Sequence, residues 1–295
     1  MKKKYVIFLV GCYLLWGFQP LYWNIFPEMD SLFLMAMRTI WCCVLTVGIL
    51  LAQGRLKSLW ELLFDRGRMK YLLPASLMLL LDWSVYTIAV RTGHIIDAGF
   101  GYYLVPIVTF FFGITLFKER CRPVQYLALF LAVCGVAVTA FGGASFSWYT
   151  VFLAATWSGY MMFQKLLGAD SILSIAAETL VLTPIMLLFI LFFRMGDNGV
   201  ASLDAVKFTY LVGAGVVTAL PMLMFSDSVV HVPLSAMSFF QYLSPTFSVL
   251  SGFLMGEKIG TARLISFAFI GAAILVFTIS SLLLAKESDR LTENP

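Results

Sequence analysis

A stretch near the middle of the chain occurs twice. Residues 99–119 read GFGYYLVPIVTFFFGITLFKE, and residues 238–258 repeat this pattern as SFFQYLSPTFSVLSGFLMGEK. Four identities share one constant separation in sequence, without a gap: Tyr103 and Tyr242, Leu104 and Leu243, Pro106 and Pro245, Gly113 and Gly252. Both copies are apolar, contain an internal proline and end in a charged pair. The sequence therefore predicts a duplicated unit.

The composition places this duplication in a membrane. The chain is 61% hydrophobic and 12% charged, with a mean hydropathy of +0.92, whereas soluble domains are about 45–50% apolar and about 25% charged. Its charged residues fall between apolar runs of about 20 residues, each long enough to cross a hydrocarbon core of about 30 Å. We predict an all-α membrane protein without a soluble domain, embedded in the lipid bilayer. The net charge of +4 therefore does not indicate nucleic-acid binding.

The apolar runs predict ten transmembrane helices. We place them at about 5–24, 31–53, 71–91, 97–117, 123–141, 147–167, 171–193, 208–228, 233–255 and 262–285. Five helices per half make the second copy run opposite to the first, which predicts a 5+5 inverted repeat with a midplane site between the halves. The expected units are residues 1–143 and 144–286, followed by a cytoplasmic tail at 287–295.

The distribution of basic residues predicts the orientation. With the first helix starting in the cytoplasm, 14 of the 20 Lys and Arg residues fall on the inner side and 5 on the outer side, while Arg38 lies within a span. This bias, which comes mostly from the first half, predicts that both termini are cytoplasmic. The first run begins with Lys2 but contains Trp16 and Gln19 and lacks a small-residue cleavage site, so we expect a retained helix and not a signal peptide.

Three charged side chains are expected at membrane depth, where each costs roughly 2.5–3.5 kcal/mol. Asp82, near the middle of the third span, is interpreted either as a cavity group that binds substrate or a proton, or as a structural hydrogen-bond partner. Arg38 lies about 10 Å below the outer end of its span at 1.5 Å per residue, and Glu178 is equally far from the inner end of its own. We therefore expect these two in opposite membrane halves, unpaired, as gating or coupling groups. The alternative for Arg38 is snorkelling to the interface.

Two matched prolines and a set of polar and aromatic residues are candidates for a central cavity. A proline inside a helix removes a backbone donor and frees a carbonyl, which at membrane depth is tolerated where it lines protein or a wet cavity. Tyr102 and Gln164 lie near these prolines as well. The alternative is that these side chains only pack between helices. The candidate substrate-binding residues are Trp16, Gln19, Asp82, Trp83, Tyr86, Tyr103, Pro106, Trp157, Gln241, Tyr242 and Pro245.

Enzyme and metal signatures are absent from the sequence. His94 and His231 have no HExxH context, and the five cysteines form no CxxC pair. No Walker, GxGxxG or GxSxG arrangement is present in a soluble unit. We therefore expect no catalytic residue, no metal and no cofactor. Any driving force must come from a gradient, with protons as the candidate coupling ion, or from a partner.

Several stretches resemble the EamA family of the drug/metabolite transporter superfamily, and within it the RarD-like branch. They are LLWGFQPLYW, MRTIW, DWSVYTIAVRTGHIIDAGFGYYLVP, AETLVLTP and FFQYLSPTFSVL, and the resemblance covers nearly the whole chain. It implies ten helices as a five-plus-five inverted repeat in the inner membrane, moving small metabolites or drugs, usually outward. The branch usually has an Asn-Trp pair where this chain has Asp82-Trp83.

The sequence leaves two main functional hypotheses. The first is a secondary-active transporter, with outward transport expected, that moves a small organic solute by alternating access through a cavity between the repeats. The second is a membrane scaffold or regulatory subunit whose polar residues only hold helices together. An intramembrane enzyme would need a catalytic pair, and none is found. The oligomeric state is not indicated by the sequence.

Overall fold

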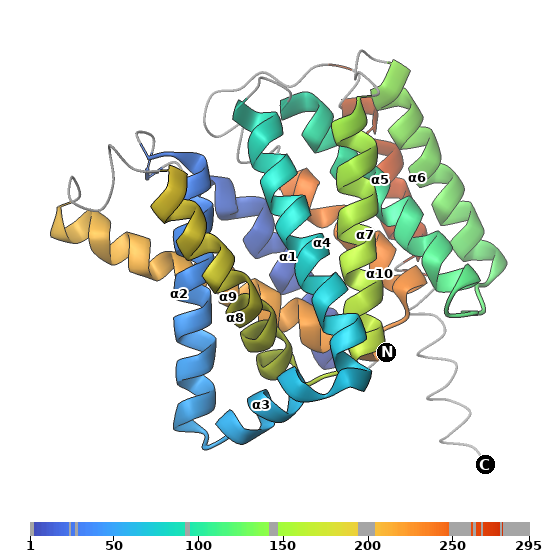
Figure 1. The fold of residues 1–295 in the computed structure, drawn as a ribbon. Helices are drawn as coiled ribbons and strands as arrows, with labels where there is room; N and C mark the ends of the chain where they lie inside the picture. Colours follow the sequence, from blue (N-terminus) through green and yellow to red (C-terminus); the bar gives the residue numbers. More distant parts are fainter. Residues whose placement is uncertain are drawn as a thin grey trace.

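The structure, a computed structural model, describes residues 3–23, 25–26, 29–91, 95–141, 147–193, 204–247, 261, 264–266, 268–277 and 279. All regular structure within these ranges is helical, as the sequence predicts (Figure 1). The helices are α1 (Lys3–Trp23), α2 (Ser31–Ala52), α3 (Leu56–Phe64), α4 (Arg66–Arg91), α5 (Ile95–Thr115), α6 (Pro123–Phe141), α7 (Trp148–Leu167), α8 (Ser171–Phe193), α9 (Ala205–His231) and α10 (Leu234–Gln241).

Most of these helices coincide with expected spans. Those at α1, α2 and α4–α9 match the first eight predicted runs, α10 begins the ninth, and a further apolar helix covers Leu264–Phe277 within the tenth. Four helices are long and apolar enough to cross a membrane: Lys3–Trp23, Leu32–Ala52, Ser171–Phe192 and Ala205–His231. The full count of ten therefore remains a prediction. The expected boundary at 143/144 and the tail at 287–295 lie outside the described residues.

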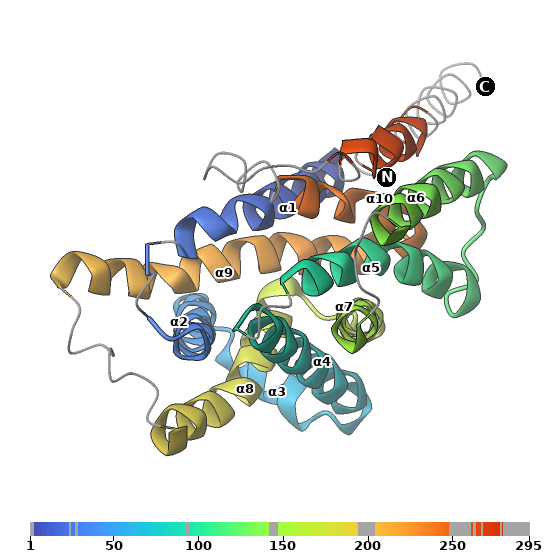
Figure 2. The same ribbon diagram turned by 90° about the horizontal axis from the view of Figure 1, so that it is seen from above.

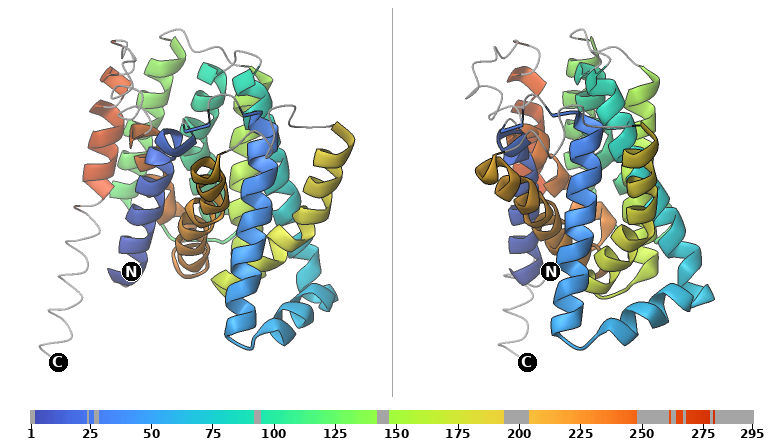
Figure 3. Two further views of the ribbon diagram at one scale, coloured as in Figure 1. Left: turned by 90° about the vertical axis from the view of Figure 1, so that its left-hand side faces the viewer. Right: turned by 60° about the vertical axis from the view of Figure 1, so that its left-hand side comes forward.

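Helix α3 is not among the predicted spans, because it falls in the segment between the second and third apolar runs. It lies crosswise to α2 and α4 at one end of the bundle (Figure 3). Gly54, in the left-handed region at φ 68°, turns the chain after α2, a conformation that glycine adopts without steric cost. Leu59 and Leu62 then bury one face, and α3 packs against α8. A short amphipathic segment thus folds by covering the end of the bundle.

The bundle core is built around α7 and α9. Helix α7 packs against α4 and α5, whereas α9 lies between α1 and α2 (Figure 2). Helix α2 also packs against α8. The contact between α2 and α9 is close, because a Cβ added at Gly215 would lie 2.6 Å from the backbone carbon of Trp41. A glycine is therefore required where these two backbones approach.

The second repeat copy is interrupted before its proline. Helix α10 ends at Gln241, Tyr242 forms a turn, and residues 243–247 are again helical. Gln241 is four residues before Pro245, so its carbonyl is the one whose helical donor the proline removes. In the first copy α5 is a continuous helix that extends to Thr115, with Pro106 inside it. The two matched prolines thus have different local geometry.

Candidate functional site

Three polar side chains at four-residue spacing line one face of α7. They are Thr156, Tyr160 and Gln164, all buried, and residues four apart share a helix face. Successive members lie about 6 Å apart along the axis, at 1.5 Å per residue. Each of them takes part in a polar contact with another helix, so α7 carries a polar ladder through the middle of the bundle.

Asp82 contacts Thr156, the first residue of this ladder. Its carboxylate is fully buried and accepts a hydrogen bond from the Tyr102 hydroxyl at 2.9 Å and from Thr156 Oγ1 at 3.1 Å. The three residues come from α4, α5 and α7. Both donors are neutral, and within the described part of the chain Asp82 forms no ion pair. An acidic side chain held only by hydroxyl groups can take up and release a proton without breaking a salt bridge.

Arg38 lies close to this carboxylate without pairing with it. Its guanidinium carbon is 3.9 Å from the ring centroid of Trp83 and 5.6 Å from that of Trp23, distances at which a cation is attracted to a ring face. Its Nε has no hydrogen-bond partner within the described ranges. Arg38 and Asp82 act on each other electrostatically, but no ion pair joins them among the described residues. A positive and a negative group thus face the same region.

Glu178, on α8, contacts Tyr160, the second residue of the ladder. Its buried carboxylate accepts from the Tyr160 hydroxyl at 3.0 Å and from Ser174 Oγ at 3.3 Å. Gln164 completes the group, because its amide nitrogen donates to the Tyr160 hydroxyl at 2.8 Å and its amide oxygen accepts from Ser174 at 2.7 Å. Glu178, like Asp82, is held by neutral donors and is a second candidate proton site.

Aromatic rings cluster around Trp157, next to Thr156 of the ladder. Trp157 contacts Trp16 with ring centroids 5.4 Å apart, Tyr160 at 5.4 Å and Phe225 at 5.7 Å. Trp16 also contacts Phe225 at 5.5 Å. Helices α1, α7 and α9 therefore meet in one aromatic cluster. Such a cluster can contact the apolar body of an organic solute, with the flanking polar groups fixing its orientation.

The remaining predicted residues are more scattered. Gln19 donates to the Val217 carbonyl at 3.3 Å, joining α1 to α9. Tyr86 contacts the Tyr102 ring at 5.7 Å but is 40% exposed, so it lies at the edge of the Asp82 group. Pro106 is buried within α5, whereas Pro245 is half-buried.

Gln241 and Tyr242 lie beside the first repeat copy. Tyr242 contacts Tyr103 with ring centroids 6.3 Å apart. Both amide atoms of Gln241 and the Tyr242 hydroxyl are buried and have no hydrogen-bond partner among the described residues. A buried polar group left unsatisfied costs roughly 1–3 kcal/mol. These atoms are therefore the clearest free hydrogen-bonding groups for a solute among the predicted residues.

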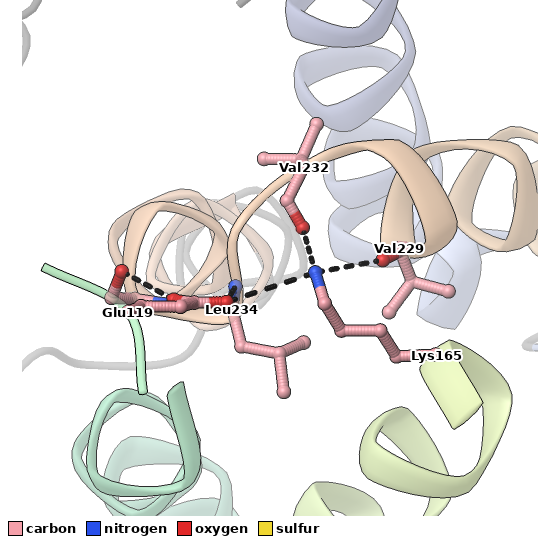
Figure 4. A network of polar contacts seen from close by, with 6 residues as sticks. Glu119, Lys165, Val229, Val232 and Leu234 are labelled. Atoms are coloured by element: carbon pink, nitrogen blue, oxygen red, sulfur yellow. Dashed lines mark hydrogen bonds and ion pairs between the residues drawn. The ribbon is translucent and has the colours of Figure 1, made fainter. Parts of the chain in front are cut away.

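A polar network joins three segments near the C-terminal end of α7 (Figure 4). This is the end of the bundle that carries α3 (Figure 1). Glu119 accepts from the backbone nitrogens of Leu234 and Ser235 at 2.8 and 2.9 Å and from Ser235 Oγ at 2.6 Å. The positive end of the α10 helix dipole stabilises a carboxylate at this position. Lys165 donates to the carbonyls of Val232 at 2.6 Å and Val229 at 3.4 Å, with its Nζ 3.7 Å from Glu119. This network ties α7 and the segment after α5 to the turn between α9 and α10.

Sequence reasoning misses several of these partners. Thr156, Tyr160 and Ser174 are not among the predicted site residues, although four-residue spacing of polar groups in an apolar run is a signal that could identify the ladder. Sequence reasoning includes Glu119 only in the charged pair that ends the first repeat copy, and Lys165 only among the counted basic residues. No sequence signal links Glu119 to Leu234, because the contact spans 115 residues. Among the described residues no group of three His, Cys, Asp or Glu side chains could hold a metal ion.

Comparison with known proteins identifies similar chains. Residues 3–141 and 146–279 each match the EamA-like transporter family. Uncharacterized transporters of Pseudomonas aeruginosa and Bacillus subtilis are each 32% identical, over 281 and 283 residues, covering 94% of this chain and 94% of the relative. The RarD protein of Escherichia coli is 27% identical over 285 residues, 95% of either chain. A solved crystal structure aligns with a TM-score of 0.73 at 18% identity, covering 95% of this chain and 99% of the other, which shows a shared fold.

Proposed function

This chain belongs to the EamA-like transporter family and is a membrane transporter, and we propose that it is secondary-active and exports a small organic metabolite or drug by alternating access. The observation that carries the proposal is Asp82, a fully buried carboxylate held by neutral donors. Such a residue within a membrane-spanning helix is a functional candidate, because its insertion is costly. Asp82 would bind the coupling proton or a cationic part of the solute.

Contacts between matched residues support two inverted halves of five helices each. Tyr103 meets Tyr242, its counterpart in the second repeat copy, and Trp16 in the first predicted helix meets Trp157 in the sixth, the first helix of the second half. Two equivalent residues touch where they lie beside the axis that relates the halves. The aromatic cluster and the broken copy at Tyr242 therefore belong near the interface of the proposed repeats, which is where transporters of this architecture bind substrate.

A second pair of contacts supports the same symmetry. A Cβ added at Gly17, the residue after Trp16, would lie 3.0 Å from the Ser244 carbonyl oxygen in the second repeat copy. Ser158, the residue after Trp157, donates at 3.4 Å to the carbonyl of Val105, which matches Ser244 in the first copy. Helices α1 and α7 thus approach the two repeat copies at matched positions, as expected if the halves are equivalent and upside down relative to each other.

The polar groups suggest a division of roles. Arg38 and Asp82 would order the outer half of the pathway, Glu178 the inner half, and Trp16, Trp157, Gln241 and Tyr242 would contact the solute. The network of Glu119 and Lys165 would close the inner end in this conformation. The positive-inside bias supports a cytoplasmic location for that end, together with the start of α1.

Solute exchange in proteoliposomes tests this function. Liposomes preloaded with unlabelled charged or neutral metabolites should take up the same labelled solute only when the protein is present. The scaffold alternative predicts no exchange with any solute tested. Exchange that a Gln241→Leu variant weakens, with the protein still folded, would support the proposed site. Exchange by that variant at the unmodified rate and affinity would place the solute elsewhere.

A further inference from the structure

Helix α3 presents an exposed aromatic pair at the end of the bundle. Trp60 is 52% exposed and Phe64 78% exposed, and their rings stack with centroids 6.0 Å apart. They lie one turn apart, whereas Leu59 and Leu62 are buried. Because α3 crosses one end of the bundle (Figure 3), a bilayer around the bundle would meet water near this pair. Tryptophan is enriched at that level.

Basic residues surround this aromatic pair. From 55 to 70 the chain has five, Arg55, Lys57, Arg66, Arg68 and Lys70, against two acidic residues, Glu61 and Asp65, a difference of +3. Three of the five are in ion pairs: Arg55 with Asp170 at 3.4 Å, Lys57 with Glu61 at 3.8 Å and Arg68 with Asp65 at 3.6 Å. Arg66 and Lys70, both exposed, form no ion pair among the described residues. They sit at the start of α4, directly after the aromatic pair.

We propose that α3 and the first turn of α4 form a binding site for an anionic phospholipid. The phosphate would lie against Arg66 and Lys70, while Trp60 and Phe64 would contact the upper acyl chains. A solvated charged face explains the basic residues but leaves two stacked, exposed aromatic rings unexplained. The combination of rings with cations outside the ion pairs fits an interfacial helix on an anionic membrane surface. This inference does not depend on whether the protein transports a solute.

Lipid-dependent stabilisation of the purified full chain tests the headgroup site. In mild detergent, phosphatidylglycerol should raise the unfolding temperature, and phosphatidylcholine should not. A double variant, Arg66→Gln with Lys70→Gln, should weaken this effect roughly thirtyfold in lipid concentration, since each basic residue near an anionic surface contributes about 1 kcal/mol, or about fivefold. The matched control, Arg120→Gln with Arg122→Gln, removes two exposed charges from another loop and should respond like the unmodified chain.

Three results would overturn the site: equal stabilisation by both lipids, an unchanged response in the Arg66/Lys70 variant, or an equal loss in the control. Stabilisation by inorganic phosphate alone, without added lipid, would show a free-anion site instead. A second measurement tests the aromatic half. Lipids brominated near the headgroup should quench the part of the fluorescence that Trp60→Phe removes, and the absence of quenching would show that Trp60 faces water.

Discussion

At the scale of single residues, Asp82 and Glu178 share one arrangement. Each is buried and accepts one hydrogen bond from a tyrosine and one from a serine or threonine. A buried charge is costly unless it is paired, and neither carboxylate forms an ion pair among the described residues. Neither site is therefore suited to a permanently charged side chain. Gln241 is the opposite case, because in the part of the chain that the structure describes neither its amide nitrogen nor its amide oxygen has a hydrogen-bond partner. The free-energy cost of leaving these two atoms without partners is offset when a ligand supplies the missing hydrogen bonds.

Replacing Gln241 with leucine should raise stability and weaken solute binding. The change removes two unsatisfied atoms, each of which costs roughly 1–3 kcal/mol, so we expect a gain of about 1–2 kcal/mol after the loss of side-chain fit. Thermal unfolding in detergent measures this gain. Gln164→Leu is the control, because it removes an amide that makes two hydrogen bonds, and it should destabilise. Loss of stability in both variants would mean that Gln241 has a structural partner.

At the scale of helices, packing at glycine decides how closely α2 and α9 approach. A Cβ at Gly215 would meet the Trp41 backbone carbon and oxygen at 2.6 and 2.7 Å, and backbone atoms cannot move aside as a flexible side chain can. Gly48, also inside a helix, has nothing within 4 Å of an added Cβ. The two positions therefore form a matched pair that separates packing from helix propensity.

Gly215→Ala should destabilise the protein by about 1–3 kcal/mol, the usual cost of overpacking. Gly48→Ala should be neutral or stabilise by roughly 0.5–1 kcal/mol, because alanine loses less backbone entropy in a helix. Thermal or denaturant unfolding of both variants under the same conditions provides the comparison. Equal effects would contradict the close contact between α2 and α9.

The network at the end of α7 should control access at that end of the bundle. Lys165→Met removes the donor to two carbonyls, those of Val229 and Val232, so we expect the α9–α10 turn to open more often. Cys121, half-buried beside Ser235, is a native reporter, since burial raises the pKa of its thiol and keeps it slow to react.

A membrane-impermeant maleimide should therefore modify Cys121 several times faster in Lys165→Met than in the unmodified chain at the same pH. Arg120→Met, which removes an exposed charge nearby, should leave the rate unchanged. An equal rate in all three proteins would show that the Lys165 contacts do not restrict this end.

The helices and the repeat could be predicted from the sequence because both depend on local pattern. Apolar length places most helices, and the two family matches, at 3–141 and 146–279, agree with the duplication that the two copies indicate. Partners across the bundle could not be predicted, since Thr156 reaches Asp82 and Glu119 reaches Leu234 only after folding. Helix α3 could not be predicted as a span, because its nine residues are too few to cross a membrane. Its buried face forms only when it packs against α8.

At the scale of the whole molecule, the two family matches and the matched contacts favour one internal axis with the candidate groups arranged around it. The aromatic cluster adjoins the α7 ladder, whose Thr156 and Tyr160 contact the two carboxylates, and the Glu119–Lys165 network would close one end. Alternating access would require the halves to rock about this region while the network opens. Asp82 would change its protonation during that cycle, whereas its hydrogen-bond donors would remain.

The most direct test is accumulation of an exchanged solute in proteoliposomes with and without a pH gradient. For the unmodified protein, we predict accumulation that the gradient increases. Asp82→Asn keeps one acceptor oxygen for one of the two hydroxyls, and its amide nitrogen can donate to the oxygen of the other. The variant should therefore fold and exchange solute but lose the increase. Glu178→Gln serves as a second carboxylate variant that distinguishes the two proton sites. Accumulation by Asp82→Asn with the same dependence on the gradient as the unmodified protein would contradict the coupling role of Asp82.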